Sequence, residues 1–159
     1  MYLSGNDISH LGADLLGRGV AKLEEANLSR TSLSNDQLHN LASQVAASSR
    51  LKCLDISYNN LSALQPAILA DMVASLTSAL LEETQLCEVQ VVPGTVDQQE
   101  LLEFQVTALS AAAAGSASLK KLSLSFNDLS SVEPLILAGL MLRQDLYLKS
   151  KLSSIMKYP

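Results

Sequence analysis

The chain has 159 residues, is 48% hydrophobic but only 4% aromatic, and carries a net charge of −5. A core with so few aromatic side chains must be filled by many similar aliphatic ones, which suits stacked repeat units better than a globule with a few large anchors. The acidity disfavours nucleic acid and anionic membrane surfaces as partners, because both are bound by basic stripes.

One sequence motif recurs along the chain, and we predict that each copy opens a structural unit. LKCLDISYNNL starts at Leu51 and LKKLSLSFNDL starts at Leu119, and both fit the pattern L-x-x-L-x-L-x-x-N-x-L. Asn59 and Asn127 occupy the Asn position. Residues 1–8 are the same motif without its first three positions.

A second form of the motif alternates with the first. LEEANLSRTSL starts at Leu23 and LTSALLEETQL at Leu76, with Thr31 and Thr84 at the Asn position. These two copies are 53 residues apart, and the first two copies of the Asn form have the same spacing. We therefore predict a doublet repeat in which each motif begins with a short strand, its aliphatic residues pointing inward.

The remainder of each unit is predicted to return as a helix. Ser34 and Gln37 form the S-x-x-Q pattern of a capping box, and aliphatic residues follow at helical spacing. Pro66 and Pro134 are each expected in the first turn of a later helix. An earlier copy of this pattern begins at Ala13.

The fourth unit is longer than the others by about 15 residues, which we place as an insertion at about 88–104. A long helix is predicted from Asp97 to Ala114, ended by Gly115, with an apolar stripe. Leu102, Val106, Leu109 and Ala113 make up that stripe. The insertion is interpreted either as an element that contacts a partner, as a neutral surface insertion, or as an artefact of the gene model.

The motifs resemble those of the leucine-rich-repeat family, and the alternation of two forms is similar to its ribonuclease-inhibitor-like class, as in the repeat regions of intracellular innate-immune receptors. The resemblance implies an α/β solenoid, a fragment of a horseshoe with parallel strands on the concave face and helices on the convex face. Residues 1–142 would hold five motifs, and residues 143–159 a degenerate repeat or tail. The chain is read as a piece of a longer array or a diverged gene product.

The same resemblance implies that a protein partner docks on the concave face. The candidate binding residues are taken from the intervening motif positions: Arg30, Tyr58, Glu83, Phe126, Asn27, Asp55, Glu25 and Lys121. Arg and Tyr are frequent hot-spot residues, but the alternative is that these side chains only pack on neighbouring strands and turns. Glu24 and Glu25 are expected to form a cross-strand charge pair with Lys52, with a charged recognition patch as the alternative.

Nothing in the sequence suggests catalysis, a cofactor or a metal site, since His10 and His39 fall in different units with no ligand at suitable spacing. We expect a protein-binding repeat module without enzymatic activity, located in the cytoplasm. The alternatives are a purely structural segment of a larger multidomain protein and a truncated, non-functional fragment. No segment is long and apolar enough to suggest a membrane span.

Overall fold

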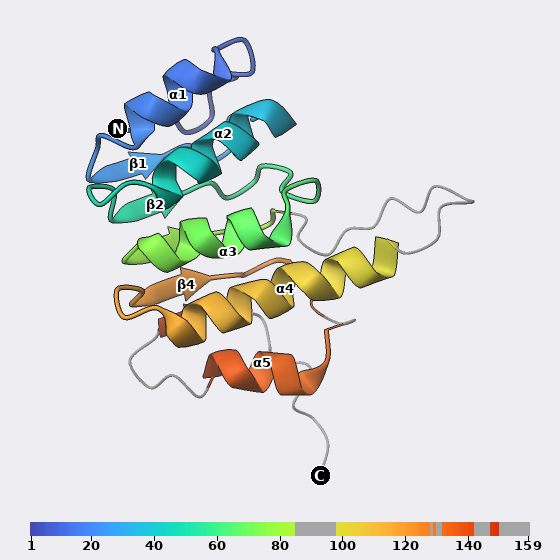
Figure 1. The fold of residues 1–159 in the computed structure, drawn as a ribbon. Coiled ribbons are helices and arrows are strands. Elements are labelled where there is room, and N and C mark those ends of the chain that lie inside the picture. Colours follow the sequence, from blue (N-terminus) through green and yellow to red (C-terminus); the bar gives the residue numbers. More distant parts are fainter. Residues whose placement is uncertain (85–97, 128, 130–131, 142–146, 150–159) are drawn as a thin grey trace.

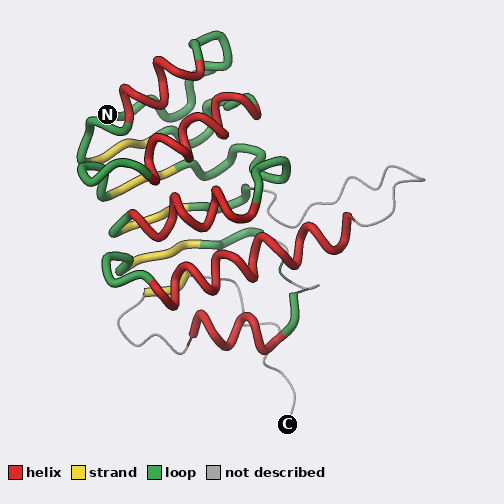
Figure 2. Tube along the Cα trace, viewed as in Figure 1, coloured by secondary structure: helices red, strands yellow, loops and turns green. Residues whose placement is uncertain are grey.

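The computed structural model describes residues 1–84, 98–127, 129, 132–141 and 147–149, which form a stack of strand-and-helix coils (Figures 1 and 2). The strands are β1 (Glu25–Asn27), β2 (Cys53–Asp55), β3 (Ser78–Leu80), β4 (Lys121–Ser123) and β5 (Tyr147–Lys149). The helices are α1 (Ala13–Val20), α2 (Asn35–Ala46), α3 (Pro66–Ser75), α4 (Gln98–Gly115) and α5 (Pro134–Met141). The strands form one parallel sheet in chain order, and the helices lie side by side along one face of it. The predicted solenoid is confirmed.

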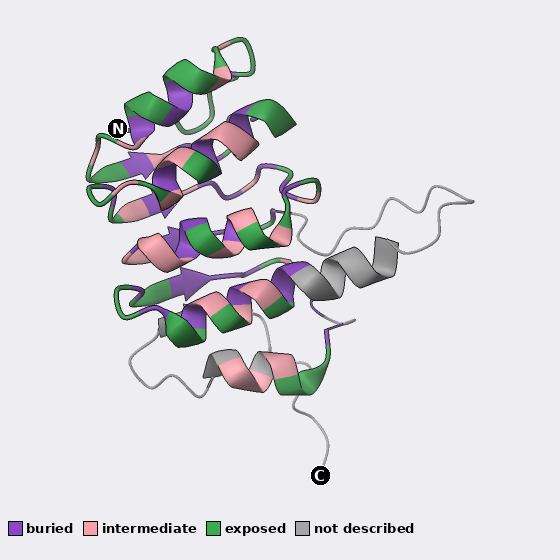
Figure 3. Cartoon of the chain, viewed as in Figure 1, coloured by how far each residue is buried: buried purple, intermediate pink, exposed green. Residues whose placement is uncertain are grey.

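Aliphatic residues of the motif align from coil to coil in the space between sheet and helices. Ala26 pairs with Leu54, which pairs with Ala79, which pairs with Leu122. Two residues further along each motif, Leu28, Ile56, Leu81 and Leu124 are each at most 1% exposed. Burying one such side chain stabilises the fold by about 2 kcal/mol. Figure 3 shows that buried residues occur in the strands and recur along the helices.

The predicted helix starts are also confirmed. Ser34 accepts a hydrogen bond from the Gln37 amide while the Gln37 side chain accepts one from the Ser34 amide. Helices α3 and α5 begin at Pro66 and Pro134, where the absent N–H leaves no main-chain hydrogen bond unmade. β5 lies within residues 143–159, which we expected to be a degenerate repeat or tail.

Helix α4 contains both the end of the predicted insertion and the regular convex helix of the fourth coil. Val106, Leu109 and Ala113 are fully buried, as the stripe predicts, and α4 packs between α3 and α5. Its first turns extend past the end of α3 (Figure 1). Residues 88–97 and the side chain of Leu102 lie outside the described residues.

The Asn of each full motif joins its own coil to the preceding one. Asn59 Nδ2 donates to the Leu28 carbonyl at 2.9 Å, and its Oδ1 accepts from the Leu33 amide at 3.1 Å. Asn127 repeats this link, with Nδ2 donating to the Leu81 carbonyl at 2.7 Å. These main-chain groups are buried and lie beyond the end of a strand, so the side-chain amide satisfies them.

A buried Gln makes the corresponding link on the helix side of the Thr-type coils. Gln37 Nε2 donates to the carbonyls of Ile8 and Leu11, both at 2.8 Å. Gln105 Nε2 donates to the Leu64 carbonyl at 2.7 Å. Consecutive coils are therefore joined alternately by Gln and Asn side chains.

The eighth motif position of each coil lies in a turn, where we had expected an exposed strand residue. The strands end three residues earlier, and the main chain at this position has a positive φ in every described copy. We call these residues the turn row: Gly5 (φ 77°), Arg30 (55°), Tyr58 (60°), Glu83 (47°) and Phe126 (63°). The left-handed backbone turns the chain toward the helix layer, so Arg30, Tyr58, Glu83 and Phe126 border the sheet and do not lie within it.

Replacing Asn59 by Ala should lower the free energy of unfolding by about 2 kcal/mol, because the buried Leu33 amide loses its partner and the Leu28 carbonyl keeps only the Thr31 hydroxyl. Asn60→Ala is the matched control, since Asn60 is exposed and its side chain accepts hydrogen bonds from the amide and hydroxyl of Ser62 in its own coil. Urea denaturation measures both variants. Equal losses would contradict the assigned role of Asn59.

Glu83→Gly should raise the free energy of unfolding by about 0.5 kcal/mol, because relief of the left-handed strain outweighs the conformational entropy that glycine loses on folding. Its neighbour Glu82 accepts a hydrogen bond from Ser123 Oγ at 2.7 Å. Glu82→Gly removes this bond and should therefore lower the free energy of unfolding. Thermal melts of the two variants against the parent compare them directly. A destabilised Glu83→Gly protein would show that its side chain contributes to folding.

Candidate protein-binding surface

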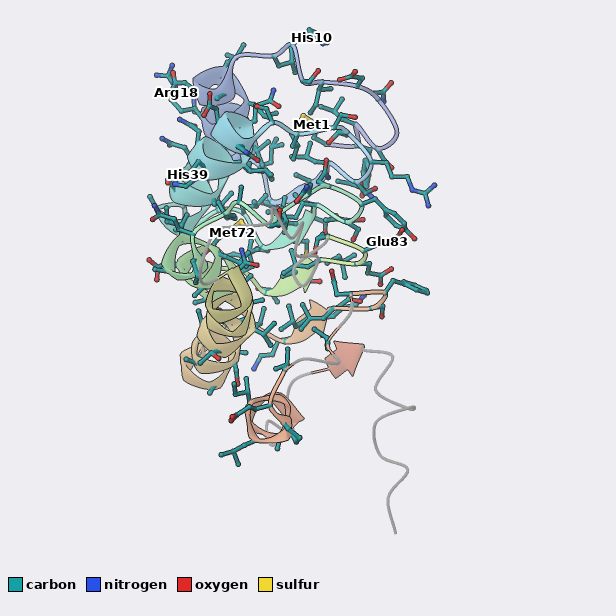
Figure 4. All side chains as sticks on the ribbon, turned by 90° about the vertical axis from the view of Figure 1, so that its right-hand side faces the viewer. Met1, His10, Arg18, His39, Met72 and Glu83 are labelled. Atoms are coloured by element: carbon teal, nitrogen blue, oxygen red, sulfur yellow. The ribbon has the colours of Figure 1, made fainter. Side chains whose placement is uncertain are left out.

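The sheet presents one face to solvent, because the described helices all lie on its other side (Figures 1 and 4). The third and fifth motif positions point to this open face, since alternate residues of a strand share a side. Third-position residues are Glu25, Cys53, Ser78 and Lys121, and fifth-position residues are Asn27, Asp55, Leu80 and Ser123. Glu25 and Lys121 are exposed and Asn27 and Asp55 are half-buried. These four candidate residues therefore lie where the sequence placed them.

The seventh motif position also lies between aliphatic positions, yet three of its residues are buried. Ser29, Ser57 and Ser125 are between 4% and 9% exposed. Ser29 Oγ shares a hydrogen bond of 2.7 Å with Ser4 Oγ, and Ser57 Oγ accepts from the Glu82 amide at 3.1 Å. Small hydroxyl side chains thus bond from coil to coil where the strand passes into the turn.

The expected charge pair between Glu24 or Glu25 and Lys52 is absent from the described residues. Lys52 Nζ instead donates to the carbonyl of Ser49 at 2.8 Å. In the part of the chain that the structure describes, the only salt bridge joins Asp14 and Arg18 on α1. Glu24 and Glu25 therefore have no salt-bridge partner among these residues.

The turn row carries large side chains along one border of the open face. The Arg30 guanidinium lies over the Tyr58 ring, 4.1 Å from its centroid, in a cation–π contact. Phe126 is 55% exposed. Figure 4 shows Glu83 on the sheet side of the molecule, away from Arg18 and His39 on the helix side. The sequence drew attention to this column of residues but gave no sign that Arg30 and Tyr58 stack.

A shallow hollow of about 150 Å³ lies on the open face between β1, β2 and β3. Glu25, Asn27, Cys53, Asp55 and Ser78 are among its lining residues, together with Tyr2, Ala26, Leu54 and Leu80. Cys53 is a free thiol. Burial raises its pKa, the negative charge of Glu25 raises the pKa further, and Lys121 opposes them. Sequence reasoning missed the hollow, because its lining residues come from neighbouring strands that are distant in sequence.

The described residues offer neither a cluster of metal ligands nor a helix that could span a membrane. No group of three or more His, Cys, Asp or Glu side chains could hold a metal ion there. His10 lies in a loop and His39 on α2, far apart in Figure 4. No helix in this part of the chain is both long and apolar enough to cross a bilayer.

Two segments of the chain, residues 50–72 and 118–140, match the Leucine Rich Repeat family. Each match begins just before an Asn-type motif and continues into the following convex helix. No curated protein matches the chain. The two matched repeats and the parallel stack of strand-and-helix coils together support a leucine-rich-repeat protein.

Proposed function

We propose that this chain is a protein-binding module that contacts its partner with the open sheet face and the adjoining turn row. Leucine-rich repeats are generally protein-binding modules. The observation that carries the proposal is the open face itself, since the helices among the described residues all lie on one side of the parallel sheet (Figure 4). Parallel sheets are ordinarily buried on both faces, so a partner surface is the natural cover for the second.

The turn row supports this proposal through its backbone conformation. Gly5 shows that glycine fits the position, yet the other described copies carry Arg30, Tyr58, Glu83 and Phe126. A left-handed conformation costs a residue with a Cβ about 1–2 kcal/mol relative to its preferred regions. Large side chains at positions that carry this cost favour a role outside folding.

The alternation of Asn-type and Thr-type coils supports the ribonuclease-inhibitor-like class, which is part of this proposal. The alternating Asn59 and Gln37 links give that doublet a structural basis. We propose a cytoplasmic location, where reducing conditions suit the free thiol of Cys53. We also propose that the chain has neither enzymatic activity nor a nucleic-acid or membrane partner, in keeping with its net charge of −5.

Site-specific photo-cross-linking tests the proposed face. A photoreactive amino acid at Asn27 or Ser78 should cross-link a saturable protein partner in cells. The same group at Asp36 on α2 or Asp71 on α3, both exposed on the helix side, should give at least tenfold less product. Mass spectrometry of the adducts identifies the partner. Equal yields from both sides would contradict the proposal.

A purely structural role is the second candidate, and Phe126→Ala separates the two. Because Phe126 is 55% exposed, its removal should change the free energy of unfolding by less than about 1 kcal/mol. Affinity for the cross-linked partner, measured by calorimetry, should fall by roughly tenfold or more if the ring is an interface anchor. Reduced stability with unchanged affinity would favour the structural role.

A further inference from the structure

We propose that the outer face of the first coil binds a second copy of this chain, which stacks on it with the end of its sheet that β5 forms. The first coil comprises residues 1–20, and its outer face is the side turned away from β1 and α2 (Figure 1). This surface lies at the end of the stack and not on the open sheet face, so the inference goes beyond the proposed function. Copies joined in this way continue one sheet from chain to chain.

Core positions that the other coils bury are partly uncovered in the first coil. Met1 stands at the fourth motif position and is 39% exposed. Its counterparts in β1 to β4 are at most 5% exposed: Ala26, Leu54, Ala79 and Leu122. Leu3, at the sixth position, is half-buried, whereas the sixth position of the next four coils is at most 1% exposed. The apolar interior of the stack therefore reaches the surface at this end.

The helix of the first coil carries an apolar residue that its counterparts cover. Leu15 on α1 is 70% exposed. The same position of the third and fifth coils holds Ile68 and Ile136, and both are partly buried against the core. Helix α3 packs on α2, which precedes it, and α5 packs on α4, whereas α1 is the outermost helix at its end (Figure 1). The helix of an added coil gives Leu15 the neighbour that the other two positions have.

The Asn6 side chain already has the arrangement that links coils elsewhere in the stack. Its Nδ2 donates to the carbonyls of Leu3 at 3.0 Å and Ser4 at 3.3 Å. Asn59 makes the same two bonds at the same distances within its own coil, and it also bonds to the Thr-type coil before it. No described group bonds to the Oδ1 of Asn6. The first coil thus holds one preformed half of a coil-to-coil link.

The main chain of the first coil offers hydrogen-bond acceptors to the same neighbour. In the third coil the Asp55 carbonyl accepts the amide of Leu28, in the preceding coil, at 2.8 Å. Tyr2 has the motif position of Asp55, and its carbonyl receives no main-chain amide from the described residues. Because these amides donate from each coil to the one that follows, the ladder has two different ends. Two copies are therefore complementary head to tail, and two first coils are not.

The opposite end of the sheet matches the first coil in polarity and in type. Among the described residues β5 pairs with β4 alone, so its outer edge is open. Its register places Leu148 at the fourth motif position, which puts Ser153, a small hydroxyl residue, at the ninth position of the sequence. Asn59 and Asn127 each follow a Thr-type coil, so a β5 coil placed before Asn6 continues the same alternation. The chain itself thus supplies the fitting neighbour.

Sedimentation equilibrium of the full chain measures this association. The contact is heterologous, so the mean mass should rise with concentration past that of a dimer. Leu15→Glu should weaken association roughly tenfold or more, because a charge replaces an apolar contact, and Asn6→Ala should weaken it about tenfold. Leu135→Glu is the matched control, since Leu135 on α5 is also exposed, and it should leave association within about twofold. A monomer at about 1 mM, or equal losses from Leu15→Glu and Leu135→Glu, would overturn the inference.

A disulfide between copies tests the register. The fifth motif position pairs Tyr2 with Asn27 at one end of the sheet and Ser123 with Lys149 at the other. Continuing the ladder puts Lys149 of one copy beside Tyr2 of the next, and strands about 4.8 Å apart hold their Cα atoms within disulfide reach.

Chains with Tyr2→Cys and chains with Lys149→Cys are mixed under mild oxidation, with Cys53→Ser and Cys87→Ser in both so that one thiol per chain reacts. The mixed disulfide should be the main product. Asp36→Cys replaces Tyr2→Cys in the control mixture, since Asp36 is exposed on α2, and the yield should fall at least roughly tenfold. Equal yields from the two mixtures would show that β5 does not dock on the first coil.

Discussion

Buried side-chain amides that reach from one coil to its predecessor are the interaction on which this solenoid depends. Each strand has only three residues, so the sheet ladder alone fixes few main-chain groups per coil. The carbonyl of Leu28 and the amide of Leu33 lie beyond the strand and out of water's reach, and Asn59 satisfies both. A buried main-chain group without a partner costs about 1–3 kcal/mol, a large fraction of the net stability of a small domain.

The alternation of these links explains why the repeat is a doublet. Gln37 joins the second coil to the first through the helix side, and Asn59 joins the third to the second through the turn side. Gln105 and Asn127 repeat the sequence for the fourth and fifth coils. Because every link is internal, the side chains on the open face are free to vary without loosening the stack.

Sequence reasoning predicted the strands, the caps and the aligned core, because each follows from short-range spacing. The role of Gln105 was not predicted. Gln105 lies 68 residues after Gln37, which is the same separation as between Leu51 and Leu119. The insertion places Gln105 inside α4, whereas Gln37 stands at a helix start and bonds to Ser34. Gln105 Oε1 accordingly has no hydrogen-bond partner in the described structure.

The open sheet face was predicted less completely, since its details depend on backbone angles and on neighbours distant in sequence. Alternation placed Glu25, Asn27, Asp55 and Lys121 on the open face, as found. The positive φ of the turn row has no single-residue signature when Arg or Tyr occupies the position, since glycine marks it only once. Ser29 and Ser57, at the seventh position, are buried where the turn brings them against a neighbouring coil.

The eighth and ninth positions of one motif are neighbours, but the structure constrains their side chains in different ways. The ninth position is occupied by Asn or Thr because its side chain must reach buried main-chain groups. That link fixes the backbone conformation of the eighth position but does not constrain its side chain. The position therefore accepts any residue that tolerates the left-handed conformation. Stacking of Arg30 on Tyr58 recovers part of that cost and joins two coils at the rim of the sheet. A rigid inner ladder thereby holds a variable outer row at a fixed spacing, which is the property that a preorganised binding surface requires.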